Sequence, residues 1–272
     1  MLKVRFAAAP ILWRGVPFEG IAREVADIGF DGIEAPVTRY REDRETLRRL
    51  LGETGLALAS TYTSGYYMDP GSREDEIRAV VEIAKLLPEF GCHTMISAPQ
   101  GLRKERKAYS LWEYRTLFEA LNEIGRRIAD FGVTQVYHNH AWTVVETRLE
   151  VDLLCAHTDP RYVKMGFDTG HLHLGWSDPV ELIRLYGDRV AYLHFKDARG
   201  RADQWLLMGK DDDVWCELGA GEVDLAGIVR ELNARNWEGW LSYEQDKTAK
   251  TPRESASESL RYAKKLVAEF GS

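Results

Sequence analysis

Apolar residues follow two alternating periods along the whole chain. Short apolar runs, many of them β-branched or aromatic, are typical of strands buried on both faces. The runs are residues 4–8, 32–35, 57–62, 93–98, 135–138, 163–167, 191–195 and 241–244. Between them, apolar residues recur at spacings of three and four, which predicts amphipathic helices. Eight such strand–helix units predict the α/β class and a closed (β/α)8 TIM barrel, forming a single domain over residues 1–272.

One connection is longer than this pattern requires. About 25 residues separate Asp197, after the seventh predicted strand, from the next helix near Glu222, whereas most such loops have only a few. The segment contains Trp205 and Trp215 among charged residues. Apolar anchors in a polar loop predict a lid-like insertion at about 197–223. Contact with a second subunit, as in a homodimer, and a surface insertion without a role are the alternatives.

Composition excludes several classes of partner. The formal net charge of −7 argues against a nucleic-acid partner, because phosphate backbones are bound by clustered Lys and Arg. Three widely separated cysteines predict reduced thiols and no disulfide framework. The N-terminus lacks the pattern of a signal peptide, and no apolar run approaches the roughly 18–20 residues that span a bilayer. A soluble cytoplasmic protein with no membrane partner is therefore expected.

A residue able to bind a divalent metal stands at the end of each of the last four predicted strands. These residues are His138, Asp168, His194 and Glu244. The carboxyl ends of barrel strands meet at one mouth, so the four side chains are expected to converge there. One such residue alone is more often structural, but four at equivalent positions favour a mononuclear metal site. Mn²⁺ or Co²⁺ is the first expectation, with Zn²⁺, Fe²⁺ and Mg²⁺ as alternatives.

Neighbouring residues extend this site. Side chains alternate along a strand, so residues two positions apart point to the same side. His140 therefore shares the side of His138 and is expected to contact substrate or, as the alternative, to support the metal-binding residues. Lys196 shares the side of His194 and gives the site a cation, although a surface ion pair with Asp197 is the alternative.

Three further residues are candidates at the mouth. Gly170 permits a turn that brings His171 back toward the site. Glu34, which ends the second predicted strand, and Glu146, in the loop after the fifth, are expected to bind substrate hydroxyls. A structural ion pair is the alternative for each of these two carboxylates.

Such a site supports a limited set of reactions. A metal bound to a ketone and an adjacent hydroxyl stabilises an enediolate and lowers the pKa of the α-proton. A carboxylate, Lys or His can then remove that proton. Return of the proton elsewhere gives isomerisation or epimerisation, whereas loss of a β-hydroxyl gives dehydration. Composition and spacing do not choose among these outcomes.

Several motifs resemble the xylose isomerase-like barrel superfamily, which includes sugar isomerases, ketose 3-epimerases, endonuclease IV and inosose dehydratase. The motifs are Phe167-Asp168-Thr169-Gly170-His171, Leu193-His194-Phe195-Lys196-Asp197, Gly219-Ala220-Gly221-Glu222-Val223-Asp224 and the terminal-strand Glu244. The resemblance extends over essentially the whole chain. It implies a metal-dependent enzyme that acts on a small sugar or cyclitol.

Within this superfamily the chain resembles the inosose dehydratases. The motifs that carry this likeness are Pro10-Ile11-Leu12-Trp13, Gly29-Phe30-Asp31-Gly32-Ile33-Glu34, His138-Asn139-His140 and Val144-Val145-Glu146-Thr147. The resemblance implies that Trp13 contacts substrate. Ketose 3-epimerases have a catalytic glutamate where this chain has His138, so proton exchange between two carboxylates is disfavoured.

The resemblance therefore predicts a metal-dependent lyase that dehydrates a cyclic keto-polyol such as 2-keto-myo-inositol through an enediolate. Glu244 would remove the α-proton, and Lys196 or His171 would protonate the leaving hydroxide. A divalent-metal-dependent sugar isomerase or ketose 3-epimerase is the alternative enzyme. A non-catalytic barrel that senses or scaffolds through its insertion is the alternative of another class. Endonuclease IV is disfavoured, because its additional metal-binding histidines are absent at the ends of strands three and four.

Overall fold

The computed structural model describes residues 2–99, 109–202 and 214–271. It confirms the predicted closed barrel, in which eight parallel strands pair in the order β1-β10-β7-β6-β5-β4-β3-β2. The strands are β1 (Lys3–Ala8), β2 (Gly32–Glu34), β3 (Ala57–Gly65), β4 (Thr94–Pro99), β5 (Thr134–Tyr137), β6 (Val163–Asp168), β7 (Val190–Phe195) and β10 (Glu238–Tyr243). A second, two-stranded sheet consists of β8 (Asp197–Ala198) and β9 (Trp215–Cys216).

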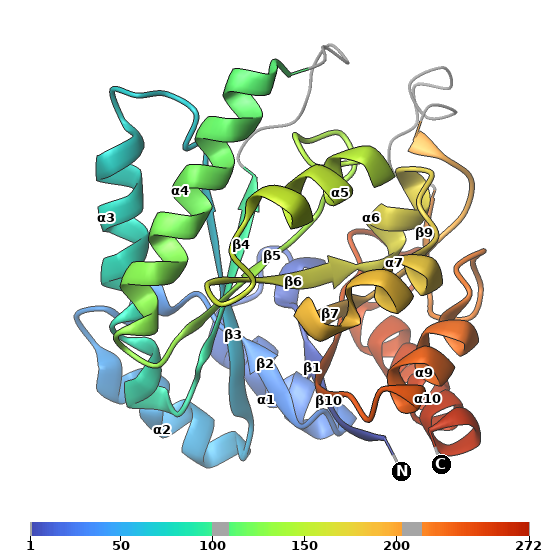
Figure 1. Ribbon diagram of the computed structural model, residues 1–272. Coiled ribbons are helices and arrows are strands. Elements are labelled where there is room, and N and C mark those ends of the chain that lie inside the picture. Colours follow the sequence, from blue (N-terminus) through green and yellow to red (C-terminus); the bar gives the residue numbers. More distant parts are fainter. Residues whose placement is uncertain (1, 100–108, 203–213, 272) are drawn as a thin grey trace.

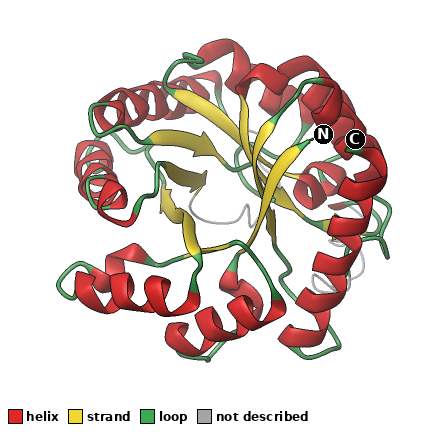
Figure 2. Cartoon of the chain, turned by 90° about the horizontal axis from the view of Figure 1, so that it is seen from below, coloured by secondary structure: helices red, strands yellow, loops and turns green. Residues whose placement is uncertain are grey.

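Helices surround this barrel (Figures 1 and 2). The described α-helices are α1 (Phe18–Ile28), α2 (Arg44–Thr54), α3 (Arg73–Ala84), α4 (Leu111–Ala129), α5 (Arg148–His157), α6 (Thr169–Leu174), α7 (Pro179–Tyr186), α9 (Leu225–Ala234) and α10 (Pro252–Phe270). Short 3₁₀ helices are η1 (Pro10–Leu12), η2 (Val37–Tyr40), η3 (Leu87–Phe90) and η4 (Gly187–Arg189). In the view of Figure 2 the strands form the inner ring and the helices the outer one.

All eight predicted barrel strands exist, and their bounds differ from the predicted ones by a few residues. The largest differences are in β3, which continues to Gly65, and in β10, which begins at Glu238. Apart from Trp240, the added residues are polar or glycine, so they lack the apolar run that identified the rest of each strand. Pairing with neighbours holds them in the ladder: Thr63 pairs with Ser97, and Glu238 with Lys3.

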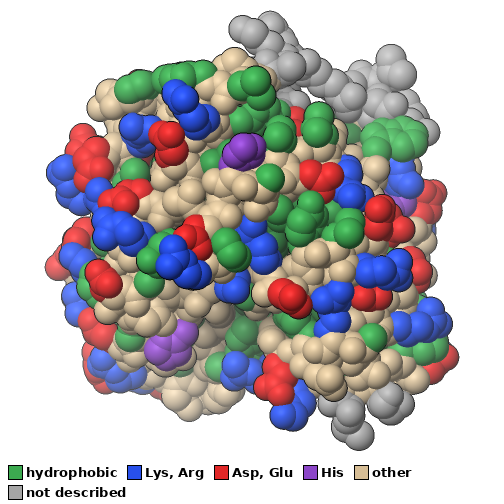
Figure 3. All heavy atoms as spheres, viewed as in Figure 1, with side chains coloured by type: hydrophobic (Ala, Val, Ile, Leu, Met, Phe, Trp, Pro, Cys, Tyr) green, Lys and Arg blue, Asp and Glu red, His purple; other side chains and the backbone are tan. Residues whose placement is uncertain are grey.

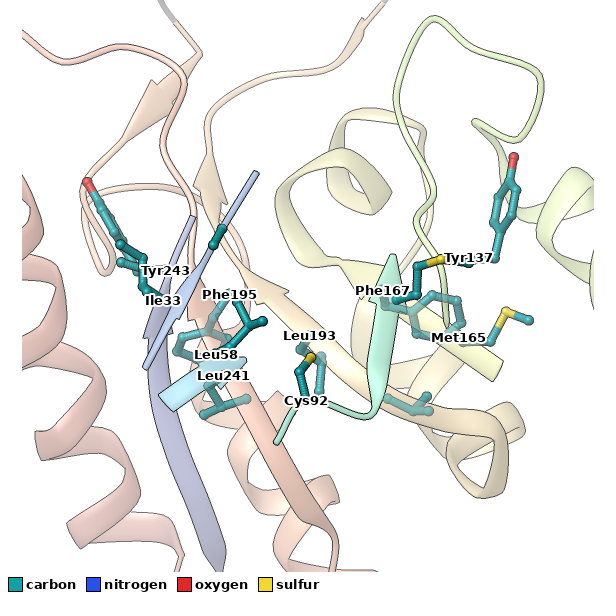
Figure 4. Packing of buried hydrophobic residues seen from close by; sticks show 14 of the residues in the cluster. Ile33, Leu58, Cys92, Tyr137, Met165, Phe167, Leu193, Phe195, Leu241 and Tyr243 are labelled. Atoms are coloured by element: carbon teal, nitrogen blue, oxygen red, sulfur yellow. The ribbon is translucent and has the colours of Figure 1, made fainter. Parts of the chain in front are cut away.

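Two apolar cores hold the barrel together. A small cluster fills its interior and is formed by Ala7, Ala59, Ile96, Val136, Tyr192 and Trp240. A much larger cluster packs the outer face of the strands against the helices. Figure 4 shows part of it, including Leu193 and Phe195 of β7 and Leu241 and Tyr243 of β10. Because side chains alternate, this outward packing turns the intervening residues of β7 and β10 toward the barrel axis.

Helix ends follow the chemistry of the local sequence. Gly29 ends α1 in a left-handed conformation, with φ of 98°, which glycine adopts without a steric penalty. Asp178 caps α7 by accepting from the backbone N–H groups of Val180 and Glu181, and Pro179 occupies the first helical position. These caps fix where each helix begins relative to the preceding strand.

The two ends of the chain meet at one end of the barrel, opposite the metal-binding candidates. The backbone N–H of Leu2 donates to the carbonyl of Gly271 at 2.5 Å, and both termini lie together in Figures 1 and 2. On the face shown in Figure 3, basic and acidic side chains are interspersed. Among the described helices, none has the length and apolar character needed to cross a membrane.

Candidate active site

The four predicted metal-binding residues converge at the mouth of the barrel. His138 directly follows β5, Asp168 ends β6, His194 lies in β7 and Glu244 directly follows β10. Each contributes one nitrogen or oxygen to a group of atoms that all lie within 4.8 Å of one another. All four side chains are buried. The strand-end pattern thus corresponds to a compact cluster in space.

Two atoms of this cluster lack the partners that buried polar atoms normally have. His138 Nδ1 and Asp168 Oδ2 are buried, and neither has a hydrogen bond to any described residue. His194 Nδ1 lies 2.8 Å from Glu244 Oε2 and 3.9 Å from Asp168 Oδ2, so these atoms face one another. Unpaired buried polar atoms are costly. Two imidazoles and two carboxylates in this arrangement fit a divalent metal ion.

The second oxygen of Asp168 is used within the fold. Asp168 Oδ1 accepts from the backbone N–H of His171 at 2.7 Å and so caps α6. Asn139 reinforces this point by accepting from the backbone N–H of Asp168 at 2.9 Å. One oxygen of Asp168 is therefore held in place while the other faces the cluster.

Glu34, at the end of β2, supports His194 from behind. Its Oε1 accepts from His194 Nε2 at 2.8 Å, from Ser242 Oγ at 2.6 Å and from Tyr192 OH at 3.0 Å. Because Nε2 donates to this carboxylate, Nδ1 is the ring nitrogen directed at the cluster. Glu34 lines the cavity described below, as expected of a substrate contact, but its Oε1 is occupied by protein donors.

Lys196 lies at the centre of the charged groups with 0% of its surface exposed. Its Nζ donates to Glu244 Oε1 at 2.9 Å and also forms an ion pair with Asp246. The predicted alternative, a surface ion pair with Asp197, is wrong. Asp197 instead accepts from the backbone N–H groups of residues 219, 221 and 223.

Burial and close charges shift the proton affinities of the cluster. Burial raises the pKa of Asp168 to about 7, although Lys196 opposes the shift. Burial lowers the pKa of His194, but Glu244 and Glu34 outweigh it and raise that pKa well above its usual value. For Glu244, burial raises the pKa, but His194 and Lys196 outweigh it and hold the pKa well below its usual range. Without metal, His194 therefore holds a proton where a cation would bind.

His140 and His171 lie beside the cluster, as predicted, with ring centroids 3.7 Å apart. His171 Nε2 is 3.3 Å from Lys196 Nζ. Burial, His140 and Lys196 hold the pKa of His171 well below its usual value, so its imidazole is neutral. Lys196 is therefore the member of this pair that holds a transferable proton.

The base of the predicted insertion reaches the same place. Trp215 in β9 lies with its ring centroid 4.7 Å from that of His171, and Lys196 Nζ is 4.0 Å from the centroid of the Trp215 ring. This contact covers one side of Lys196 with an aromatic face. Residues 203–213 of the insertion, including Trp205, lie outside the described residues.

A cavity of about 550 Å³ opens beside the cluster. His138, Glu244, Asp246 and His140 line its inner end. Trp13 also lines it, and its indole N–H donates to Glu24 at 2.7 Å, so the ring offers the cavity an apolar surface. Glu146 is buried and is not among the lining residues, so the described structure places it apart from the other candidate substrate contacts.

Two of the lining residues that lie next to the cluster were not among the candidates predicted from the sequence. Asp246 contacts Lys196, and it stands two positions after Glu244, as His140 does after His138. The same alternation could therefore have identified it. Tyr62 of β3 lines the cavity with its ring centroid 5.7 Å from that of His138. A tyrosine in a polar part of a strand offers no comparable signal.

The chain is similar to known proteins along almost its whole length. Residues 22–266 match the family model described as xylose isomerase-like TIM barrel. An inosose dehydratase of Geobacillus kaustophilus (strain HTA426) is 29% identical over 294 residues, covering 97% of this chain and 94% of that protein.

Solved structures share the fold at lower identity. A xylose isomerase-like TIM barrel protein from Mycobacterium smegmatis, solved in complex with magnesium, has a TM-score of 0.80 at 18% identity and covers 98% of each chain. An L-ribulose 3-epimerase has a TM-score of 0.79 at 16% identity, covering 98% of this chain and 95% of that one. At these identities the likeness establishes the fold alone.

Proposed function

The chain belongs to the xylose isomerase-like TIM barrel family, and we propose that it is a metal-dependent hydro-lyase of that family. The comparisons support a sugar-modifying enzyme of the dehydratase or isomerase/epimerase type. Its substrate would be a cyclic keto-polyol such as 2-keto-myo-inositol. The observation that carries this proposal is the buried cluster of His138, Asp168, His194 and Glu244 with its unpaired atoms. The similarity to an inosose dehydratase supports the substrate class.

These four residues would hold one divalent ion, with Mn²⁺ or Co²⁺ the first expectation. When bound, the ion would polarise a ketone oxygen and an adjacent hydroxyl and so acidify the α-proton. Glu34 and the backbone of His171 hold His194 and Asp168 in the orientations this requires. The protein thus supplies a preorganised ligand set.

The two oxygens of Glu244 face different partners. Oε2 faces His194 Nδ1 in the ligand cluster, whereas Oε1 faces Lys196 Nζ at 2.9 Å. We infer that Oε1 removes the α-proton, which leaves an enediolate on the substrate. Lys196 then gives a proton to the β-hydroxyl, which leaves as water, and regains one from Glu244. Proton count and charge balance over these steps, and His171 lies within reach of Lys196 as a relay.

Dehydration is favoured over epimerisation by the residue that follows β5. Proton exchange across a substrate needs a second free carboxylate opposite Glu244, and His138 occupies that strand end. The other carboxylates lining the cavity are Glu34, whose Oε1 accepts from three protein donors, and Asp246, which is paired with the same Lys196 as Glu244. The structural likeness to an L-ribulose 3-epimerase keeps a sugar isomerase or ketose 3-epimerase as the second candidate.

The test is turnover of 2-keto-myo-inositol by metal-free protein and by protein loaded with Mn²⁺ or Co²⁺. We expect diketone absorbance to appear only with metal. Absence of that product from the loaded protein would exclude this substrate. Solvent deuterium in recovered ketose or its epimer would favour the isomerase or epimerase.

A further inference from the structure

We propose that Arg14 and Arg39 form an anion-binding subsite at the outer part of the cavity, so that the substrate bears a carboxylate or phosphate group away from its reacting carbons. The proposal rests on the proposed function, because it describes the far end of the keto-polyol, and it narrows that class to members with an anionic group, which 2-keto-myo-inositol itself lacks. It adds a charge requirement that the metal cluster does not impose.

Both arginines come from neighbouring loops at the mouth. Arg14 lies between η1 and α1, in the connection that follows β1, and Arg39 lies in η2, which follows β2. β1 and β2 are paired in the barrel, so these connections are adjacent. Both arginines line the cavity whose inner end contains His138 and Glu244. A single ligand in this cavity can therefore meet the ligand cluster and the arginines.

The two guanidinium groups differ from most others in the protein. Most described arginines lie within 4.0 Å of a carboxylate, such as Arg23, Arg44, Arg48, Arg126, Arg127 and Arg148. In the part of the chain that the structure describes, Arg14 and Arg39 have no such partner.

Carboxylates within the cavity do not neutralise these arginines. Glu34 is bonded to His194, while Glu244 and Asp246 contact Lys196. All three are therefore engaged at the inner end. The cavity combines inner carboxylates that are engaged by His194 and Lys196 with two arginines farther out that have no carboxylate partner among the described residues.

An anion explains this arrangement better than a hydroxyl group does. A guanidinium offers only donors, in a planar fork that matches carboxylate and phosphate oxygens. Val16, Phe18 and Ile21 line the cavity beside the arginines and offer no polar group. The chain as a whole has a formal net charge of −7, so an anionic ligand needs local cations to enter.

The experiment measures calorimetric binding of matched ketoses to the full-length, metal-loaded protein. D-fructose is the neutral probe, D-fructose 6-phosphate the phosphate probe and 5-keto-D-gluconate the carboxylate probe. The quantity compared is the ratio of anionic to neutral affinity, in wild type and in Arg14→Gln and Arg39→Gln. Arg261→Gln is the matched control, because Arg261 is exposed on α10 and does not line the cavity.

We expect each cavity variant to lower this ratio by about tenfold, and Arg261→Gln to leave it unchanged. The probe whose ratio falls identifies phosphate or carboxylate as the natural group. An anionic preference that persists unchanged in both cavity variants would arise at the metal and would overturn the subsite. Equal affinity for all probes in wild type would also overturn it. Turnover of 2-keto-myo-inositol tests the proposed function separately, so either proposal can fail while the other stands.

Discussion

Glu34 and His194 are joined by a hydrogen bond of 2.8 Å between Oε1 and Nε2, on the side of the imidazole that faces away from the metal-binding candidates. The bond fixes both the ring orientation and the position of the proton, so Nδ1 is left to face Asp168 and Glu244. The same oxygen also accepts from Ser242 and Tyr192, which anchors Glu34 itself. Glu34, which was predicted to bind substrate, therefore positions the imidazole of His194.

Glu34→Gln is expected to weaken metal binding by about 10–100-fold, because a neutral amide holds the imidazole less firmly. Titration of metal-free protein with Mn²⁺ measures the change. Glu238→Gln is the control, since Glu238 forms an exposed ion pair with Lys3 at the other end of the barrel. Unchanged affinity in Glu34→Gln would contradict the positioning role.

Glu244→Gln is expected to lower kcat by about 10²–10⁴-fold, because an amide cannot accept the α-proton. It should also weaken metal retention, since the same side chain belongs to the ligand cluster. Single-turnover assays at saturating metal separate the two effects. Activity near that of wild type would show that both roles assigned to Glu244 are wrong.

The cluster of metal-binding candidates could be predicted because barrel topology converts sequence position into spatial position. His138, Asp168, His194 and Glu244 are far apart in sequence, yet each ends a strand, and parallel strands end at one mouth. The same topology placed Lys196 correctly through the alternation of side chains. The sequence pattern was enough to predict the position of a residue wherever a strand itself sets the direction of the side chain.

Loop residues could not be placed in this way. Glu146 lies in the loop after β5 rather than at the strand end, and that loop buries it away from the cavity. Arg14 and Arg39 are unremarkable in sequence, because exposed arginines occur throughout the helices. Only the path of the connections after β1 and β2 brings them to the cavity.

Lys196→Met is expected to reduce both stability and activity. Removing the ammonium takes a cation away from the buried carboxylates of Glu244 and Asp168 and from the partly exposed Asp246, which costs about 3–5 kcal/mol of unfolding free energy. Urea unfolding of the metal-free protein measures this loss, and turnover should fall because the proton donor is gone. Wild-type stability would show that the ammonium does not balance these carboxylates.

The same variant should bind a second metal ion at high concentration. His171, Glu244 and Asp246 each offer an atom within 4.8 Å of the others, and Lys196 Nζ contacts all three residues in the wild type. Elemental analysis should give one ion per wild-type chain and up to two per variant chain. Wild-type protein that itself binds two ions would contradict this view of Lys196.

Metal affinity is expected to rise with pH. In metal-free protein the pKa of His194 is well above its usual value, so binding at neutral pH must displace its proton. Asp168, whose pKa burial raises to about 7, releases a further proton below that pH. Affinity should therefore rise about tenfold per pH unit above pH 7, and more steeply below it. Proton release, measured by calorimetry in buffers of different ionisation enthalpy, checks this; zero release at pH 7 would contradict it.

Two helical glycines should respond oppositely to substitution by alanine. A Cβ at Gly125 in α4 would lie 2.2 Å from the carbonyl oxygen of Tyr162, so Gly125→Ala must displace the helix from the loop before β6. We expect it to lower the free energy of unfolding by about 1–3 kcal/mol or more. Gly52 in α2 has no atom within 4 Å of its Cβ position. Gly52→Ala should therefore stabilise the protein by about 0.5–1 kcal/mol. Urea unfolding of both variants measures the two changes in free energy of unfolding. A stabilising Gly125→Ala would show that α4 does not approach the barrel this closely.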